Sequence, residues 1–305
     1  RAVLTGYRRV CLPSRNLRPA WAMIPTNNVV VISDTHCGCR IGLCPTSGVK
    51  LDEGGTYKAS KLQRKLWGMW REFWDEWVPE ATRGEDFCVV MNGDALDGAP
   101  HKSKSNISTN LADQANIAYE ALAPVVEACE GRYFHIRGTE AHVGKSAENE
   151  EQLAQRLGAI PTSDGQSSRF DLRKVIGPKR RIIHCIHHIG TTGSQAYEAT
   201  AVGKELIESY VEAARWGHKA PSVVVRSHRH RNIGIQFPIQ DAVETHETGT
   251  AWSVVTPCWQ GKTPFVWKIP GGRLSTPQFG GILIRWAHDE LFVRPKVWTV
   301  PPSKV

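Results

Sequence analysis

Short apolar runs that lead straight into acidic and histidine residues recur along this chain. The first run, NVVVIS at 28–33, is rich in β-branched residues and has the length of a buried strand. Similar runs follow at 87–91, 132–136, 181–186 and 222–225. Stretches with apolar residues three or four positions apart lie between most of them, which is typical of helices. This alternation predicts an α/β protein whose first strands pair mainly in parallel.

Each of the five predicted strands ends in candidate ligands. In chain order these are Asp34 and His36, Asp94 and Asp97, Glu140 and His142, His187 and His188, and His228 and His230. Because the carboxyl ends of parallel strands face one crevice, we expect these side chains to converge there. A single Asp-x-His or His-x-His pair is most often a polar turn, so the prediction depends on their recurrence.

The mixture of carboxylates and imidazoles indicates which cations such a site would hold. Mn, Fe, Zn and Co accept both ligand types, whereas Ca and Mg prefer shells made only of oxygen. Two divalent cations held roughly 3.5–4 Å apart need about seven or eight ligands, one of them a bridging carboxylate. The strand ends supply enough ligands for such a pair.

The apolar periodicity predicts helices, and it places them at 56–79, 108–130, 146–157 and 194–216. Pro79 should end the first helix, Pro124 should kink or split the second, and Ser146 should cap the third.

Beyond residue 231 the helical period disappears. Short apolar runs near 252–256, 264–268 and 281–286 are interrupted by Gly, Pro, Thr and Trp. We expect this β-rich tail to supply a second sheet. No linker divides the chain, so residues 23–305 are expected to form a single domain.

Most of the excess positive charge lies in the first 22 residues. The whole chain has 38 basic and 30 acidic residues, a net charge of +8. The first 22 residues contain five arginines and no acidic residue, which leaves 33 basic against 30 acidic residues, or +3, for the rest. That balance gives little support for binding along a nucleic-acid backbone. We expect an unstructured or non-native leader at 1–22, with an organellar transit peptide as the alternative.

The cysteines and the apolar runs favour a reduced, cytoplasmic protein. Cys88 and Cys185 lie inside apolar runs, and no secretory signal is recognisable. Cys37, Cys39 and Cys44 resemble part of a zinc site but lack a fourth ligand at a suitable spacing. No run approaches the roughly 18 apolar residues of a membrane helix, so no membrane partner is expected.

Taken in chain order, the strand-end motifs resemble those of the calcineurin-like metallophosphoesterases. That family has Asp-x-His, Gly-Asp-x-x-Asp, Gly-Asn-His-Asp/Glu, a lone His after a strand, and Gly-His-x-His. The matching residues between 28 and 231 are Asp34 and His36, Gly93, Asp94 and Asp97, His187, and His228 and His230. The resemblance implies a four-layer α/β/β/α sandwich of two mixed sheets flanked by helices.

The resemblance also implies a ligand set for two divalent transition metals. Manganese is expected first, with iron, zinc or cobalt as alternatives. Asp94 would bridge the pair. The first metal would take Asp34, His36 and His230, and the second would take His187 and His228. His188 is the alternative to His187, and Asp97 is either a loop cap or a residue that supports a ligand.

The third motif departs from the family pattern. After Gly138 the family has Asn and His, whereas this chain has Thr139 and Glu140. Glu140 could coordinate the second metal, and His142 could donate the proton to the leaving oxygen. The alternative is an incomplete second metal site, with a weak enzyme or one that works with one metal.

The resemblance implies hydrolysis of a phosphoester substrate by a metal-held hydroxide. A phosphodiesterase or nuclease is expected first, and a phosphomonoesterase is the alternative. A metal-free scaffold with the same fold is a further alternative. Phosphate contacts could come from the segment 102–106 or from Arg226, Arg229 and Arg231. The sequence leaves the oligomeric state open.

Overall fold

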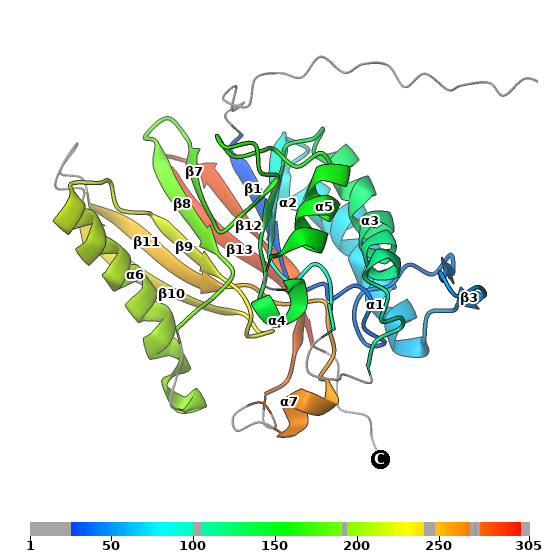
Figure 1. Cartoon of the computed structure of the whole chain (residues 1–305). Helices are drawn as coiled ribbons and strands as arrows, with labels where there is room; N and C mark the ends of the chain where they lie inside the picture. The colour runs from blue at the N-terminus through cyan, green and yellow to red at the C-terminus, as the bar shows by residue number, and fades with distance from the viewer. Residues whose placement is uncertain are drawn as a thin grey trace, which may run out of the picture.

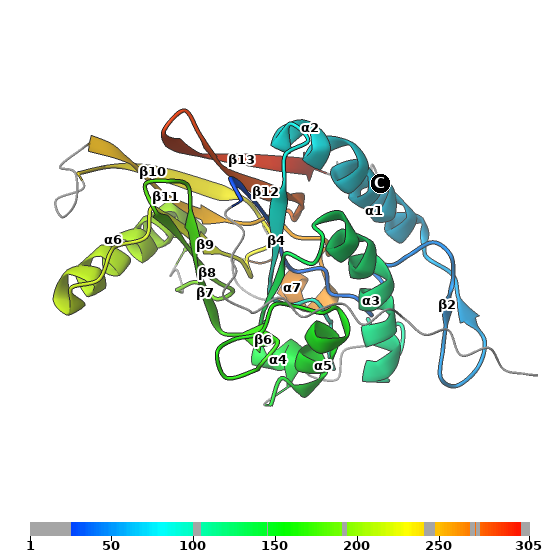
Figure 2. The ribbon, with the colours of Figure 1, turned by 90° about the horizontal axis from the view of Figure 1, so that it is seen from above.

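Two stacked sheets with helices on both outer faces make up the molecule, as Figures 1 and 2 show for the computed structural model. The structure describes residues 26–99, 105–144, 146–190, 194–240, 248–268, 272 and 275–299. Within these residues, the first sheet has six strands in the order β13-β12-β1-β4-β5-β6. Their bounds are β1 Asn28–Ile32, β4 Phe87–Asn92, β5 Tyr133–Ile136, β6 Ser168–Arg169, β12 Gln278–Ala287 and β13 Glu290–Thr299.

The second sheet has five strands in the described parts of the chain, in the order β10-β11-β9-β8-β7. Their bounds are β7 Asp171–Ile176, β8 Arg181–Ile186, β9 Val223–Arg226, β10 Ile233–Gln240 and β11 Thr248–Val255. Both sheets are mixed. Strands β1, β4, β5 and β6 run parallel in one sheet and β8, β9 and β11 in the other, with antiparallel strands at the remaining positions.

Most helices cover the first sheet. On that side lie α1 Lys61–Glu72, a π-helical turn at Phe73–Trp77, α2 Val78–Thr82, α3 Leu111–Ala128 and α5 Glu148–Arg156. Helix α6 Glu198–Trp216 packs on the outer face of the second sheet. The short helices are α4 Glu140–Val143, α7 Pro264–Lys268 and the 3-10 turn Gln195–Tyr197, and β2 Val49–Lys50 pairs with β3 Thr56–Tyr57 outside the sheets. The predicted α/β/β/α sandwich is confirmed.

Burial on both faces explains why the central strand β1 consists mainly of apolar residues. In β1, Val29 and Val31 pack between the two sheets, whereas Val30 and Ile32 face the helices. A strand buried on both faces has no solvent side on which polar residues would appear. Only at its carboxyl end does β1 lead into polar residues.

The first predicted helix begins later and ends later than expected. Ser60 caps α1, because its Oγ accepts from the N–H of Gln63 while the Gln63 side chain accepts from the N–H of Ser60. Pro79 does not stop the helical path, which passes through the π-helical turn and continues to Thr82. Pro79 lies in the first turn of α2, where a missing N–H costs little.

Other local predictions also differ from the structure. Pro124 lies inside α3 and does not split this helix. The residue before α5 is Ala147, in a left-handed conformation and without a side-chain cap, so Ser146 does not cap this helix. The run at 264–268 is the helix α7, and the tail adds strands to both sheets.

No helix in the described residues has both the length and the apolar character needed to cross a membrane. The predicted leader, residues 1–22, lies outside the described residues.

Candidate metal centre

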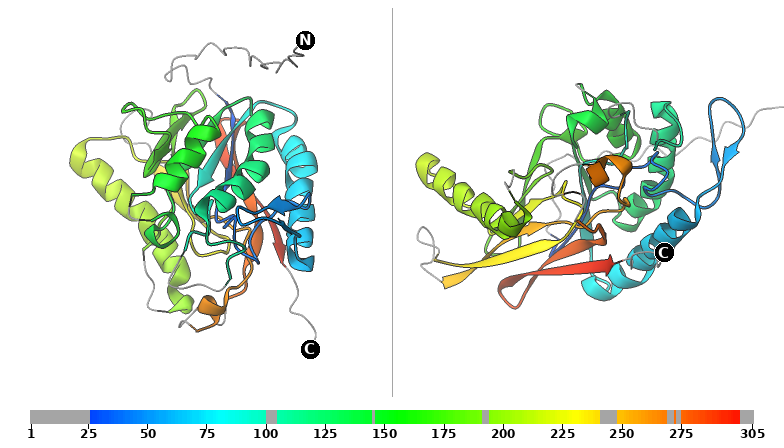
Figure 3. Two further views of the ribbon diagram at one scale, coloured as in Figure 1. Left: turned by 45° about the vertical axis from the view of Figure 1, so that its right-hand side comes forward. Right: turned by 90° about the horizontal axis from the view of Figure 1, so that it is seen from below.

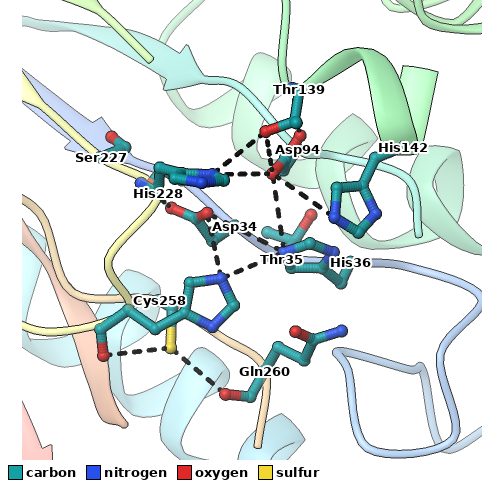
Figure 4. Close-up of polar contacts among 12 residues, drawn as sticks. Asp34, Thr35, His36, Asp94, Thr139, His142, Ser227, His228, Cys258 and Gln260 are labelled. Carbon is teal, nitrogen blue, oxygen red and sulfur yellow. Dashed lines mark hydrogen bonds and ion pairs between the residues drawn. The ribbon is translucent and has the colours of Figure 1, made fainter. Parts of the chain in front are cut away.

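The loops after β1, β4, β5, β8 and β9 bring the predicted ligands together at one end of the sandwich. Five of these residues have a left-handed backbone, namely Asp34, His36, Asp94, His228 and His230, with φ between 42° and 73°. Such a conformation costs a non-glycine residue roughly 1–2 kcal/mol, and residues of this kind concentrate at functional sites. The strained turns aim carboxylates and imidazoles at a common centre (Figure 4).

One group of side chains surrounds Asp34, which is fully buried. Its Oδ1 lies 3.2 Å from Nε2 of His230 and 3.8 Å from Nε2 of His36. The two Nε2 atoms are themselves 3.2 Å apart. Among the residues that the structure describes, Oδ1 of Asp34 has no hydrogen-bond partner. A buried carboxylate oxygen without a donor, beside two imidazole nitrogens, fits a cation ligand.

A second group surrounds Asp94, which is also fully buried. Its Oδ2 lies 3.1 Å from Nε2 of His187 and 3.9 Å from Nδ1 of His228. The same oxygen lies 3.8 Å from Nε2 of His36 in the first group. Asp94 therefore contacts histidines of both groups. In the described part of the chain, Asp34 with His36 and His230, and Asp34 with Asp94 and His187, are groups that could hold a metal ion.

Contacts on the far side of each ring aim three imidazoles at the centre. Nδ1 of His187 lies 2.7 Å from the carbonyl oxygen of Asn92, and Nδ1 of His142 lies 2.7 Å from that of Asp97. Since a carbonyl only accepts, Nδ1 of each carries the proton and Nε2 faces the cluster. Nδ1 of His36 lies 3.3 Å from Oδ1 of Asp97. Such outer contacts are usual for histidines that bind metals.

Asp97 supports the cluster from behind. Its carboxylate accepts hydrogen bonds from Gln260 at 3.0 Å and from Asn106 at 3.2 Å, and it faces His36. Of the two roles expected from the sequence, these contacts match the support of a ligand.

The third motif brings Thr139 to the cluster. Its Oγ1 lies 3.2 Å from Oδ2 of Asp94, 3.2 Å from Nε2 of His187 and 3.1 Å from Nδ1 of His228. Glu140 is exposed at the first position of α4 and takes part in none of the four possible metal groups of the described residues. Thr139 and His142 are three positions apart, so both face the centre while Glu140 points elsewhere.

His142 lies at the edge of the cluster. Its ring packs edge-on against His36, with centroids 4.5 Å apart, and its Nε2 is 4.0 Å from Oδ2 of Asp94. With His36 and Asp97 it also forms a group that could hold a metal.

His188 and His184 lie apart from Asp34 and Asp94. The exposed ring of His188 is 5.1 Å from that of His187 and 5.7 Å from that of His228, and the three form a separate possible metal group. The side chain of His184 is directed to Asp171, 3.7 Å away.

The two buried carboxyls of the cluster favour their ionised form, and two of its histidines favour their protonated form. Burial opposes ionisation of Asp34 and Asp94, yet the neighbouring histidines outweigh it and hold the pKa of both carboxyls well below the usual value. Burial likewise opposes protonation of His36 and His187. Asp34 and Asp97 nevertheless raise the pKa of His36 to about 10, and Asp94 raises that of His187 to about 9. Protons thus supply the charge that a divalent cation can replace.

The arginines near the fifth motif have carboxylate partners from α6. Arg229 and Arg231 pair with Glu198 at 3.2 and 2.7 Å. Arg226 pairs with Glu205 at 2.8 Å. These contacts tie the segment that carries His228 and His230 to α6, so the arginines serve its geometry.

Glu150 is a site residue that the sequence analysis missed. It is fully buried, its Oε1 accepts from the N–H of Ala95 at 3.3 Å, and its Oε2 accepts from the N–H of Gly138 at 2.9 Å. One carboxylate therefore holds the loops of the second and third motifs together. Nothing in the polar helix around Glu150 distinguishes it in sequence from its acidic neighbours.

The described cysteines are buried and free of disulfides. In the described part of the chain none of them enters a possible metal group, so the Cys37, Cys39 and Cys44 pattern does not form a zinc site there.

No protein-family model and no curated protein matches this sequence. Among solved structures, a Vps29 double mutant from Entamoeba histolytica is similar with 9% identity over 89% of this chain and 99% of the other, at a TM-score of 0.36. A Thermotoga maritima protein solved by NMR has 10% identity, coverage of 90% and 99%, and a TM-score of 0.33. Vacuolar protein sorting 29 from Cryptosporidium parvum has 10% identity, coverage of 90% and 100%, and a TM-score of 0.32. Scores this low support no argument about function.

Proposed function

We propose that this chain is a metal-dependent hydrolase of phosphoesters and that it prefers phosphodiesters to phosphomonoesters. The observation that carries the proposal is the pair of fully buried carboxylates, Asp34 and Asp94, set among imidazole nitrogens. The order of its motifs, which resembles that of the calcineurin-like metallophosphoesterases, supports the same reaction.

The carboxylate, imidazole and hydroxyl donors fit two divalent transition metals. We propose manganese as the metal, with iron, zinc or cobalt as alternatives. Asp34, His36 and His230 would hold the first, and His187, His228 and the hydroxyl of Thr139 would hold the second. Asp94 would be shared between them. When bound, such a pair supplies an acidified water as nucleophile and neutralises charge on the phosphoryl oxygens.

The remaining residues orient the histidine rings, supply a proton donor and keep bulk water away from the ligands. Asp97 and the carbonyl of Asn92 keep His36 and His187 turned towards the centre. His142 presents Nε2 at the edge of the cluster, where it would protonate the leaving oxygen of the substrate. Burial of both carboxylates keeps bulk water from competing for the ligand positions.

Metal analysis combined with two chromogenic substrates tests the proposal. The purified chain should retain Mn²⁺ and hydrolyse bis-p-nitrophenyl phosphate faster than p-nitrophenyl phosphate, and EDTA should abolish turnover. Asp94→Asn should remove activity. Asp113→Asn, which alters a buried aspartate in α3, is the matched control and should keep it. A preference for the monoester would indicate a phosphatase instead.

A metal-free scaffold is the competing function, and the third motif favours it. Thr139 offers a hydroxyl where the related motif has an amide, and Glu140 lies outside the cluster. A chain that binds no transition metal and turns over neither substrate would establish the scaffold.

A further inference from the structure

The connection between β11 and β12 is fastened to the metal centre at both ends. At its start, the N–H of Trp259 donates to the carbonyl of Asp34 at 3.0 Å, and the side chain of Gln260 donates to Asp97 at 3.0 Å. At its end, the N–H of Gln278 donates to the carbonyl of His230 at 2.9 Å. The described residues 261–268 therefore follow directly after an anchor at the rim of the cluster.

Helix α7 presents two large aromatic side chains from this connection. Phe265 is 61% exposed and Trp267 is 60% exposed. Figures 1 and 3 show α7 beyond the carboxyl ends of the strands, at the same end of the molecule as α4. Four extended steps from Gln260 to Pro264 and three helical steps to Trp267 put the Cα atoms of Gln260 and Trp267 at most roughly 19 Å apart. The aromatic pair lies within a few nucleotide lengths of the cluster.

Positive charge accompanies these rings. Nζ of Lys262 lies 3.5 Å from the centroid of Trp267, and Lys268 is exposed at the end of α7. The sequence from 256 to 277 contains no acidic residue. Two rings flanked by ammonium groups can contact both the bases and the phosphates of a nucleotide strand.

We propose that Lys262, Phe265, Trp267 and Lys268, here named the α7 platform, bind the base and phosphate of a nucleotide-containing substrate. The aromatic rings stack on bases and the lysines contact phosphates, while the diester bond lies at the metal centre. The role at the reaction rests on the proposed function, since the platform would serve that site. An apolar protein partner fits less well, because the exposed ammonium group of Lys268 follows directly after Trp267.

Binding of a labelled oligonucleotide tests the platform without any turnover. The probe is a fluorescein-labelled single strand of roughly ten nucleotides, within the site sizes of known single-strand binders. Fluorescence anisotropy is measured with the full chain in EDTA at fixed salt. Trp267→Ala should weaken binding about tenfold, and Phe265→Ala should weaken it in the same direction. Equal affinity of these variants and the unaltered chain would overturn the proposal.

Trp216→Ala is the matched control. Trp216 is 69% exposed, but it lies at the carboxyl end of α6, far from α7 in Figure 1. Its replacement should leave binding unchanged, and an equal loss would mean that exposed tryptophans bind the probe without specificity. Trp267→Phe should restore most of the affinity, because a smaller ring still stacks. Competition with a cyclic nucleotide or with unlabelled strand then identifies whether one nucleotide or several occupy the platform.

Kinetics separate this proposal from the proposed function. Trp216→Ala should keep kcat and KM on both substrates, whereas Trp267→Ala should raise KM on the oligonucleotide about tenfold. An equal fall in kcat on both substrates would make Trp267 structural and overturn the platform. A chain that binds the strand through Trp267 but hydrolyses neither substrate would overturn the enzyme and leave the platform standing.

Discussion

The hydroxyl of Thr139 lies 3.2 Å from Nε2 of His187. A neutral hydroxyl is a weaker ligand than a carboxamide oxygen. In the two-metal arrangement that we propose, the second metal would therefore have one weaker donor than the family pattern provides.

Thr139→Asn should therefore tighten binding of the second equivalent of Mn²⁺ and leave the first unchanged. The substitution replaces the hydroxyl with a carboxamide oxygen, which is the ligand type of the related motif. Calorimetric titration of the metal-free chain measures both equivalents. Glu140→Gln is the control, and it should change neither because Glu140 is exposed. A second equivalent that weakens in Glu140→Gln would place Glu140 among the ligands.

Asp97→Ala should weaken the first equivalent of Mn²⁺ by about 10- to 100-fold, the usual effect of removing a group that orients a ligand. His36 loses the carboxylate 3.3 Å from its Nδ1 and becomes free to turn. Titration with Mn²⁺ measures the loss, and thermal unfolding measures how much of it comes from the fold. An unchanged affinity for Mn²⁺ would mean that Asp97 only caps its own loop and does not support His36.

Glu150→Ala should destabilise the fold and weaken metal binding together. The change leaves the N–H groups of Ala95 and Gly138 without their acceptor, at about 1–3 kcal/mol each. Urea unfolding and Mn²⁺ titration measure the two effects.

Its neighbour on α5 provides the control for this change. Glu151 accepts from the N–H groups of Ser167 and Ser168, at 2.7 and 2.8 Å. Glu151→Ala should lower stability without changing the affinity for Mn²⁺. Equal losses of affinity in both variants would show that α5 acts only through overall stability.

The metal-free protein should become less stable as the pH rises from 6.5 to 9. The pKa values of His36 and His187 are raised to about 10 and about 9, above the usual 6.5. Their contribution to the free energy of unfolding is therefore complete below pH 6.5 and is lost as the pH rises towards these values. Melting temperatures of EDTA-treated and Mn²⁺-loaded protein measure the effect, and only the first should fall. A melting temperature that rises over this window in EDTA contradicts the assignment.

The same pKa values predict proton release on metal binding. At pH 7.5 both imidazoles are protonated in the metal-free protein, so the uptake of Mn²⁺ should release about two protons. Calorimetry in two buffers of different ionisation enthalpy counts them, and a count of zero would mean that these histidines are not displaced by metal.

The local pattern of the chain determined the strands and where they end. Between Asn28 and Ser33 the run is entirely apolar, so both its burial and the position of Asp34 follow from neighbours in sequence. The same holds for 87–91 and for Asp94. Strands β7 and β10 escaped prediction because they lie at sheet edges, where alternation with polar residues weakens the apolar signal.

Only the tertiary structure decided which side chains reach the metal centre. Three questions were left open by the sequence: whether Thr139 or Glu140 faces the cluster, whether Asp97 supports a ligand or caps a loop, and whether the arginines pair with carboxylates or face phosphate. Each answer depends on contacts with segments far away in sequence. Glu150 is the sharpest case, because the two N–H groups that it holds belong to loops 55 and 12 residues away. Recurring Asp and His at strand ends are a local property, whereas the direction of each side chain is set by the packing of the whole chain.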